Sequence, residues 1–246
     1  MNETVMLLTA RKSERSFKDA PVPDNMLDAV IEAGYRAPTT KNIQDVSVIV
    51  VRDHARKAKL AEYAGNQVWV AQAPIFLVLV ADLRKAAEAS REANRVCMLQ
   101  DCVEGLIVSG QDCGIAFCAM QTAANSLGLG VVPIGGIRNN PPEVVDLLEL
   151  PPLTFPMLGM CIGYVNKPSR ARPRLPMDTF RHDERYNPAS LPRAVKQYDE
   201  TLRAFWRAVG RPDGKSWSET LGQTYDHNSR PKIRPTLTMQ GLSFMD

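Results

Sequence analysis

The chain has 246 residues, of which 44% are hydrophobic and 23% charged, and its formal net charge is +3. This is a globular composition, and the length predicts one large domain or a domain with an extension. The small charge, with no long run of Lys and Arg, argues against nucleic-acid binding. No apolar run has the length of a membrane span and no secretory signal is recognisable, so we expect a cytoplasmic protein that does not act at a membrane.

The cysteines and histidines indicate neither disulfides nor a metal site. The three histidines are scattered and no cysteine pair has CxxC spacing, so we expect no bound metal. An odd number of cysteines among apolar residues favours buried free thiols in a reducing cytosol. The five are Cys97, Cys102, Cys113, Cys118 and Cys161.

The first third of the chain predicts two helices and then a strand. Apolar spacing indicates a helix over residues 3–12, with Val5, Leu8 and Met6 as candidates for its inward face. A second helix begins at Pro23-Asp24 and ends before a proline at 38. The β-branched run 47–53 predicts a buried strand.

Helices and strands then alternate. HARKAKLAEY and NQVWVAQA predict helices, residues 74–82 a second buried strand, and residues 83–96 a solvated helix or a mobile excursion. A long central helix is expected from Met98 to Leu127, packed on several sides. The remaining predicted elements are a strand over 131–136, a helix over 141–150, a strand over 155–165, helices over 193–209 and 217–225, and a loose tail over 230–246.

The segment RKSERSF, residues 11–17, concentrates positive charge and hydroxyl groups near the start of the chain. In an extended backbone Arg11, Ser13 and Arg15 project to one side, because side chains alternate with a period of two. Two guanidinium groups and a hydroxyl on one face would suit a phosphate group. A solvated basic turn explains the same residues about equally well.

Other segments are candidates for a ligand site, each with an ordinary structural alternative. In VPIGGIRNN two glycines after a strand let a ligand approach the backbone, although a plain strand-to-helix turn has the same pattern. In RARPRLP, alternating Arg170, Arg172 and Arg174 indicate an anion site or a basic linker. The polar loop RAPTTKNIQ and Gln67 in GNQVWVAQAP are weaker candidates.

Motifs for a protein-borne nucleophile or metal are absent. The sequence contains no GxSxG, no HExxH and no paired-carboxylate signature. This fits an enzyme whose cofactor performs the difficult step, and it fits a binding protein equally well.

Taken together and in this order, these segments resemble the flavin-dependent nitroreductase family. The residues that carry the resemblance are RKSERSF, RAPTTKNIQ, GNQVWVAQAP, SLGLGVVPIGGIRNNPPEVVDLLELP, FPMLGMCIGYV, RPRLP and QYDETL, over most of residues 5–205. The chain is more similar to the oxygen-insensitive, NADPH-linked nitroreductase A and flavin reductase branch.

The resemblance implies an α+β sandwich, a central mixed β-sheet flanked by helices, in a homodimer with FMN at the subunit interface. We expect a core over 1–166 and a C-terminal helical extension over 167–246 that packs on the core and the partner subunit, the whole forming a single domain. The resemblance also implies the residues that hold FMN. They are Arg11, Lys12, Ser13, Arg15, Thr39, Gln67, Pro133, Ile134, Gly135, Gly136, Arg172 and Arg174.

Each of these positions has an implied role. Arg11, Ser13, Arg172 and Arg174 would hold the FMN phosphate, with Lys12 in the same segment. Arg15 would lie at the pyrimidine edge of the flavin, and Gln67 would hydrogen-bond the ring. Thr39 would reach FMN from the partner, while residues 133–136 would run along the ring with a glycine N–H at N5. Arg15, Gly135 and Gly136 are therefore the candidate catalytic residues.

The implied function is an FMN-dependent NAD(P)H oxidoreductase that reduces nitroaromatics, quinones or flavins by a ping-pong scheme. A flavin reductase that supplies a partner monooxygenase and a non-catalytic flavin-binding protein are the alternatives. The chain departs from the branch at Gly222 and Gln223, where an arginine that faces the substrate is expected. Arg207, Arg211 and Lys215 are candidates for the NADPH 2′-phosphate.

Overall fold

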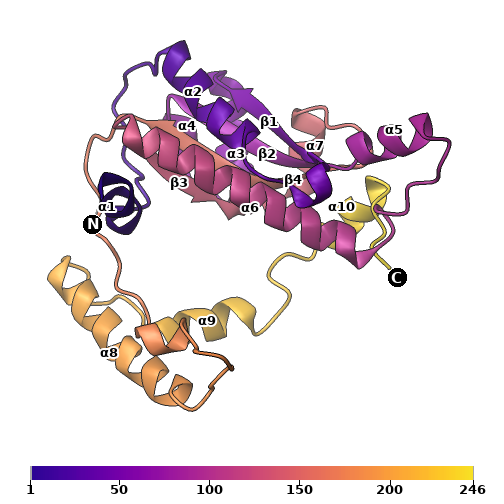
Figure 1. Cartoon of the computed structure of the whole chain (residues 1–246). Helices are drawn as coiled ribbons and strands as arrows, with labels where there is room; N and C mark the ends of the chain where they lie inside the picture. The colour runs from indigo at the N-terminus through magenta and orange to yellow at the C-terminus, as the bar shows by residue number, and fades with distance from the viewer. Residues whose placement is uncertain (1, 246) are drawn as a thin grey trace. The chain divides into compact units, whose positions relative to one another are not determined.

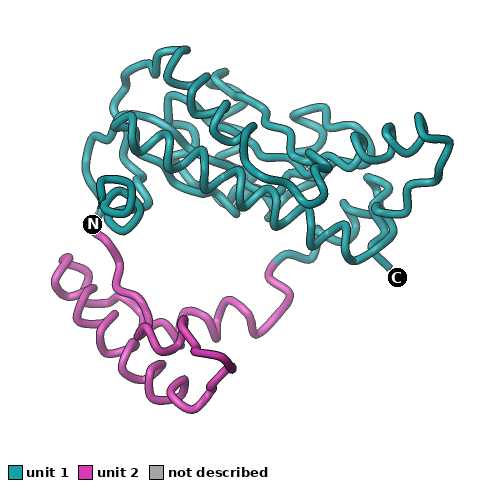
Figure 2. The backbone as a smooth tube through the Cα atoms, in the orientation of Figure 1, with its two compact units in different colours: residues 1–169, 230–246 teal, residues 170–229 magenta. Residues whose placement is uncertain are grey.

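The computed structural model describes residues 2–245, which form two compact units (Figures 1 and 2). Unit 1 is the described part of Met1–Ser169 and Arg230–Asp246, and unit 2 is Arg170–Ser229. The strands of unit 1 are β1 (Val46–Val51), β2 (Ile75–Asp82), β3 (Gly130–Ile134) and β4 (Thr154–Gly163). Its helices are α1 (Glu3–Ala10), α2 (Asp24–Tyr35), η1 (Thr40–Asn42), α3 (His54–Tyr63), α4 (Val68–Gln72), α5 (Arg84–Glu92), α6 (Val103–Ser126), η2 (Gly135–Arg138), α7 (Pro141–Leu147) and α10 (Ile233–Met239).

The four strands form one sheet in the order β1-β2-β4-β3. All three pairings are antiparallel, so within the described residues the sheet does not have the mixed character that was expected. The neighbours β1 and β2 are joined through α3 and α4, and β3 and β4 through η2 and α7, yet each pair runs antiparallel. The register between β2 and β4 shifts after Leu79, where Met157 of β4 has no partner. Such a bulge locally interrupts the hydrogen-bonded ladder, and here the carbonyl of Met157 accepts a hydrogen bond from Arg138.

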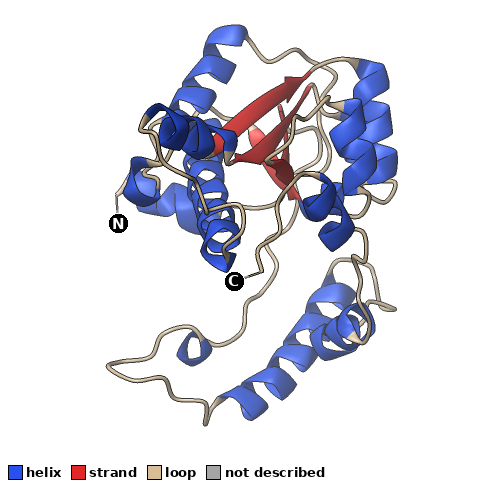
Figure 3. Cartoon of the chain, turned by 90° about the vertical axis from the view of Figure 1, so that its right-hand side faces the viewer, coloured by secondary structure: helices blue, strands red, loops and turns tan. Residues whose placement is uncertain are grey.

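The two faces of the sheet are covered by different helices, which gives the layers seen in Figures 1 and 3. Along β2, Ile75, Leu77 and Leu79 pack with α2 and α6, while Phe76, Val78 and Val80 pack with α3, α4 and α7. A strand buried on both faces is an uninterrupted apolar run, which is why residues 74–82 could be identified from the sequence. The α+β sandwich is confirmed.

The helix α6 is long and apolar enough, by length and composition alone, to cross a membrane, although no such run was recognised in the sequence. It packs instead against α2 and the sheet, with Asp112 and Gln121 buried on its inner side. These are the contacts of a core helix. The predicted start at Met98 is wrong, because α6 begins at Val103. The backbone carbonyls of Gln100 and Asp101 accept hydrogen bonds from residues 243–245 instead.

Two predictions about the chain ends are also wrong. No residue of α1 is buried, and Val5, Met6 and Leu8 are exposed, because no element of the described chain covers that face. The tail is not loose, since α10 packs Leu237 against a small core with Leu83 and Phe155. Residues 230–246 therefore belong to unit 1, whereas the sequence analysis placed all of 167–246 in one extension.

Unit 2 contains η3 (Met177–Thr179), α8 (Leu191–Ala208) and α9 (Trp217–Tyr225). The helix α9 begins with a complete capping box, in which Ser216 and Glu219 exchange side-chain and backbone hydrogen bonds. Tyr198 of α8 packs edge-on against Trp217 of α9, with ring centroids 5.8 Å apart. Both predicted helices of this region are confirmed within two residues at each end.

Candidate functional site

The segment Arg11–Phe17 runs beside β3 in unit 1. The backbone N–H of Glu14 donates to the carbonyl of Val131 at 3.0 Å. The side chain of Glu14 is buried, and its Oε2 accepts from the N–H of Ser169 at 2.7 Å. The next residue, Arg15, is exposed. Arg11, Lys12 and Ser13, which precede them, are each partly accessible and do not alternate in burial.

Arg15 lies against α4. Its guanidinium carbon is 5.6 Å from the centroid of the Trp69 ring, and Nη1 donates to the carbonyl of Ser13 at 3.2 Å. Gln67 is the residue that precedes α4, and its Nε2 donates to the carbonyl of Ala64 at 2.8 Å. A guanidinium held over an aromatic ring keeps its charge and a defined direction.

The turn Pro133–Gly136 has one side open and one side packed. Pro133 is exposed and Gly135 partly exposed, whereas Ile134 and Gly136 are buried. A Cβ on Gly136 would overlap Gln67 and the carbonyl of Ala64, so this glycine allows the turn to touch the end of α3. A Cβ on Gly135 would meet nothing closer than 3.5 Å. The structure therefore places Gln67 against the packed side of this turn at Gly136, and Arg15 against Trp69, two residues further along the chain from Gln67.

Two arginines that the sequence analysis did not name as site residues border this turn. A Cβ on Gly135 would lie 3.5 Å from Nη2 of Arg138 and 3.7 Å from Nη2 of Arg230. Arg138 donates to the carbonyl of Met157, the residue at the β4 bulge. Burial, and then the charge of Arg230, lowers the pKa of Arg138. Arg138 stood in the quoted GGIRNN, but Arg230 gave no signal because its segment was expected to be loose.

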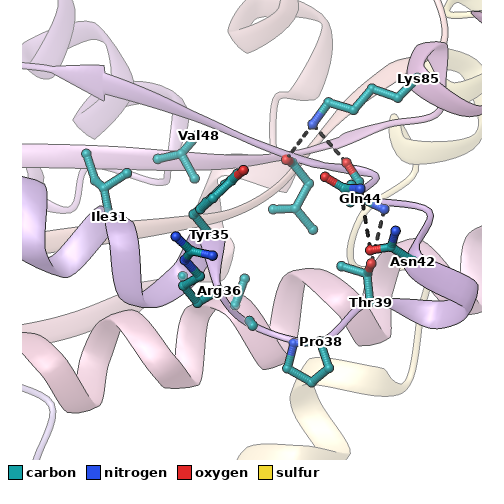
Figure 4. A pocket seen from close by; sticks show the side chains of 13 residues that line it. Ile31, Tyr35, Arg36, Pro38, Thr39, Asn42, Gln44, Val48 and Lys85 are labelled. Carbon is teal, nitrogen blue, oxygen red and sulfur yellow. Dashed lines mark hydrogen bonds between the residues drawn. The ribbon is translucent and has the colours of Figure 1, made fainter.

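Thr39 lines a cavity of about 520 Å³ (Figure 4). Its walls come from α2, the loop after it, β1 and Lys85, and none of the other predicted FMN residues is among the described residues that line it. The hydroxyl of Thr39 accepts from the N–H of Gln44 at 3.1 Å. Lys85 closes one side, with Nζ donating to the carbonyls of Gln44 and Val46, each at 2.8 Å. These hydrogen bonds hold the loop that carries Thr39. The Gly135 turn of the same chain is not among the described residues that line the cavity beside this loop.

Two buried acidic residues, Asp112 and Asp45, lie next to the loop that carries Thr39. Asp112 of α6 accepts from the backbone N–H of Thr40 at 2.9 Å and from its hydroxyl at 3.2 Å. Asp45 is fully buried, and neither of its carboxylate oxygens has a hydrogen-bond partner among the described residues. Burial, and then the charge of Asp112, raises the pKa of Asp45 to about 6. A proton on Asp45 relieves the repulsion between the two carboxylates.

Arg172 and Arg174 lie in unit 2, and both are exposed. The hydroxyl of Tyr198 donates to the carbonyl of Pro173 between them, at 2.8 Å. The guanidinium carbon of Arg172 is 5.0 Å from the ring centroid of Trp206. The segment is therefore fixed within its unit. Its convergence with residues 11–15 of unit 1 stays a prediction.

Unit 2 also has a polar cavity of about 320 Å³. Its lining includes Arg203, Arg207 and Lys215. Arg203 forms an ion pair with Glu219 at 3.1 Å, and Nζ of Lys215 donates to Gln223 at 2.6 Å. Two of the three cations proposed for a 2′-phosphate, Arg207 and Lys215, thus line one cavity.

The expected burial of the free thiols holds for two of the five cysteines, Cys113 and Cys161, whereas Cys118 is exposed. All five cysteines are free, and burial raises the pKa of Cys113 and Cys161 well above its usual range. Within residues 2–245, no group of three or more His, Cys, Asp or Glu side chains is arranged to hold a metal ion.

Comparison with known proteins gives the family. The nitroreductase family profile matches residues 8–164, and the profile of the C-terminal domain of that family matches residues 172–245. The chain belongs to the nitroreductase family. It is 40% identical over 245 residues to a Bacillus subtilis protein named FMN reductase [NAD(P)H], with 98% of each chain covered.

Two further relatives extend the likeness. The chain is 33% identical to the oxygen-insensitive NADPH nitroreductase of Salmonella typhimurium, again with 98% of each chain covered. The solved structure of NfrA2 from B. megaterium matches the whole of both chains with a TM-score of 0.96 at 36% identity. The resemblance stated from the sequence is confirmed.

Proposed function

We propose that this protein is an FMN-dependent NAD(P)H oxidoreductase that reduces small electron acceptors, among them nitroaromatics, quinones and flavins. Its likeness to proteins named FMN reductase and NADPH nitroreductase supports the cofactor, the co-substrate and the enzyme class. The observation that supports the proposal most directly is the glycine turn, where Gly136 packs on Gln67 and Gly135 leaves an open surface, with Arg15 held over Trp69 of the adjoining helix α4.

The chemistry of these residues fits FMN. A planar ring needs a surface without a Cβ, and Gly135 provides one whose nearest neighbours are the ends of two arginine side chains. A phosphate group needs cations and hydroxyls, which Arg11, Lys12 and Ser13 provide in unit 1 and Arg172 and Arg174 in unit 2. Bound there, FMN would supply the redox chemistry, hydride acceptance from NAD(P)H and two-electron reduction of an acceptor in a separate, ping-pong half-reaction.

The protein's own part is to bind, orient and supply charge. Arg15 stays protonated at every working pH, so at the pyrimidine edge of the ring it stabilises the negative charge that reduction places there. Gln67 orients the ring through its amide. Pro133 and Gly135 form the surface on which the ring lies, while the buried Ile134 and Gly136 hold that surface against the core.

We infer a homodimer that uses α6. One side of α6 is exposed and carries apolar or small residues at helical spacing. A Cβ on Gly114 would meet no atom within 4 Å, so another helix can approach closely there. The stripe consists of Val103, Ile107, Gly110, Gly114 and Cys118. In such a dimer Thr39 would reach the partner's FMN, in line with its separation from the predicted FMN residues of its own unit.

A cytoplasmic location follows as part of the proposal. Reduced thiols persist in the cytosol, and all five cysteines are free. NAD(P)H, the proposed electron donor, is a cytosolic metabolite in reduced form.

The decisive experiment is an absorbance spectrum of the purified protein before and after anaerobic NADPH, repeated with NADH. Yellow protein that bleaches on addition of either nucleotide supports the oxidoreductase. Protein that binds FMN but keeps its flavin absorbance would instead be a flavin-binding protein. Turnover of free FMN compared with turnover of nitrofurazone then separates a flavin reductase from a nitroreductase.

A further inference from the structure

The indole ring of Trp206, near the end of α8, contacts two guanidinium groups. The guanidinium carbon of Arg172 lies 5.0 Å from the ring centroid, and that of Arg211 lies 4.9 Å from it. Both distances are within the range in which the face of a ring attracts a cation. The two arginines come from different segments of unit 2, so the ring is what they have in common.

Trp206 is itself firmly held. Its Nε1 donates to the carbonyl of Lys215 at 2.9 Å, and its own carbonyl accepts from the N–H of Arg211 at 2.8 Å. A Cβ on Gly214 would overlap the ring, so the turn after α8 packs directly onto it. Phe205 packs edge-on at a centroid distance of 5.2 Å. The turn that carries Arg211 and Lys215 thus packs against the side chain of Trp206.

The two charged groups over the face of Trp206 are both cations, although the turn that packs on the ring also carries Asp213. Neither Arg172 nor Arg211 forms an ion pair within 4.0 Å in the described part of the chain. Two neighbouring guanidinium groups repel each other, and an aromatic face offsets part of that repulsion without neutralising either charge. The arrangement holds cations in place and leaves them able to bind anions.

We propose that Trp206 is a positioning residue that directs Arg172 toward the FMN phosphate and Arg211, with Lys215, toward the 2′-phosphate of NADPH. The inference rests on the function proposed above, which assigns phosphates to these cations, and it adds the residue that holds both sets. Trp206 acts through the arginines and touches neither the reacting atoms nor the acceptor.

The proposal predicts a loss at two sites from one substitution. In holoprotein, Trp206→Leu raises the dissociation constant of FMN about fivefold and the KM for NADPH by a similar factor, the expected effect of losing one guanidinium–aromatic contact at each site. The KM for NADH and the kcat at saturating FMN stay unchanged, because NADH has no 2′-phosphate. Trp206→Phe keeps a ring face and restores most of both affinities.

The matched control is Trp217→Leu. Trp217 lies in the same unit and packs on Tyr198, and no guanidinium group lies over its ring within the described residues. Trp217→Leu leaves the ratio of the KM values for NADPH and NADH at its wild-type value. In an Arg211→Gln background, Trp206→Leu should change the KM for NADPH no further, since its effect passes through Arg211. Trp206→Met repeats the test with a side chain of similar reach but no aromatic face, so that the result does not depend on one variant folding.

Three outcomes overturn the proposal. The first is that Trp206→Leu and Trp206→Met bind FMN and NADPH as tightly as the wild type does. The second is that they raise the KM for NADH as much as the KM for NADPH, and the third is that Trp217→Leu reproduces their losses. Either of the last two results would indicate a general loosening of unit 2. Failure of the proposed function looks different, because the wild-type protein itself then fails to bleach with NADPH.

Discussion

The carboxylate of Asp112 accepts a hydrogen bond at 2.9 Å from the backbone N–H of Thr40, 72 residues earlier in the chain. The middle of the core helix α6 thereby fixes the loop that carries Thr39. Asp112→Ala removes the acceptor and leaves a buried N–H unpaired, which costs about 1–3 kcal/mol. We expect a lower free energy of unfolding in urea and faster FMN release, because the loop is proposed to reach the partner's FMN.

The control for this prediction is the neighbouring Gln111. Its Nε2 lies 3.4 Å from the hydroxyl of Thr40 in an exposed position, so Gln111→Ala should change stability by less than about 0.5 kcal/mol. Equal losses from both substitutions would contradict the role given to Asp112.

The pH dependence of stability should report on Asp45. Its pKa is raised to about 6 by burial and by Asp112, so the folded state binds the proton more tightly than the unfolded state. Stability then falls as the pH rises from about 4 to about 6 and levels off above that, with a total change of about 2–3 kcal/mol from this group. Asp45→Asn removes the charge and should gain stability relative to the wild type at pH 8.

The measurement is the difference in free energy of unfolding between Asp45→Asn and the wild type from pH 4 to pH 8. Taking the difference cancels the titration of the other acids. A difference that does not vary with pH would show that Asp45 titrates normally.

Two adjacent glycines should respond oppositely to alanine. In Gly136→Ala the new Cβ overlaps Gln67 and Ala64, so the thermal midpoint should fall, with a loss of about 1–3 kcal/mol. In Gly135→Ala the Cβ has room, so the midpoint should stay near the wild type while FMN affinity falls, because the methyl group enters the surface proposed for the ring. Intact FMN affinity in Gly135→Ala would place the ring elsewhere.

Arg15→Ala should slow flavin reduction more than it weakens FMN binding. A charge-assisted contact contributes about 1.5–3 kcal/mol, which corresponds to a rate loss of about 10- to 100-fold. Stopped-flow absorbance after mixing with NADPH measures the rate directly. Arg15→Lys should recover part of it, and an unchanged rate in Arg15→Ala would rule out the electrostatic role.

The proposed dimer can be tested on α6. Ile107 is 56% exposed in the single chain, so Ile107→Asp should leave the fold intact yet dissociate a dimer that buries this stripe. Leu127, at the end of the same helix but on its opposite side, is 38% exposed, and Leu127→Asp is the matched control. Light scattering after gel filtration gives the mass. Two dimeric variants would place the interface away from this stripe.

The strand β2 could be predicted because burial on both faces makes residues 74–82 an apolar run, whereas β1, predicted as a buried strand, is an edge strand that is mostly only partly buried. The central helix could be predicted for the same reason, but its start could not. The carbonyl of Gln100 accepts from the N–H of Ser243 at 3.0 Å, and no local pattern reports a bond across so long a stretch of sequence.

The C-terminal helix α10 could not be predicted either, because its contacts are also distant in sequence. The helix α10 contains a proline and two threonines, so its local propensity is poor. It is held by tertiary contacts, among them Gln240, whose Nε2 donates to the carbonyls of Pro151 and Thr154. Arg230, just before this helix, was missed as a neighbour of Gly135 for that reason.

The candidate site was predicted in its unit 1 part from the order of motifs. The roles of Arg15 and Gln67 stay predictions, whereas the exposed stripe of α6 was interpreted as a further buried side. A helix face that is apolar for another subunit has the same composition as one that is apolar for its own core. Composition alone therefore cannot distinguish the two.

The chain leaves unit 1 after Ser169 and rejoins it at Arg230, with both junctions tied down by hydrogen bonds, one to Glu14 and one to Asn139. A protease that nicks an exposed turn of the intervening 60-residue stretch thus separates two fragments that each retain part of the same hydrophobic core. The cleaved molecule should migrate as one species in a native gel and as two under denaturing conditions.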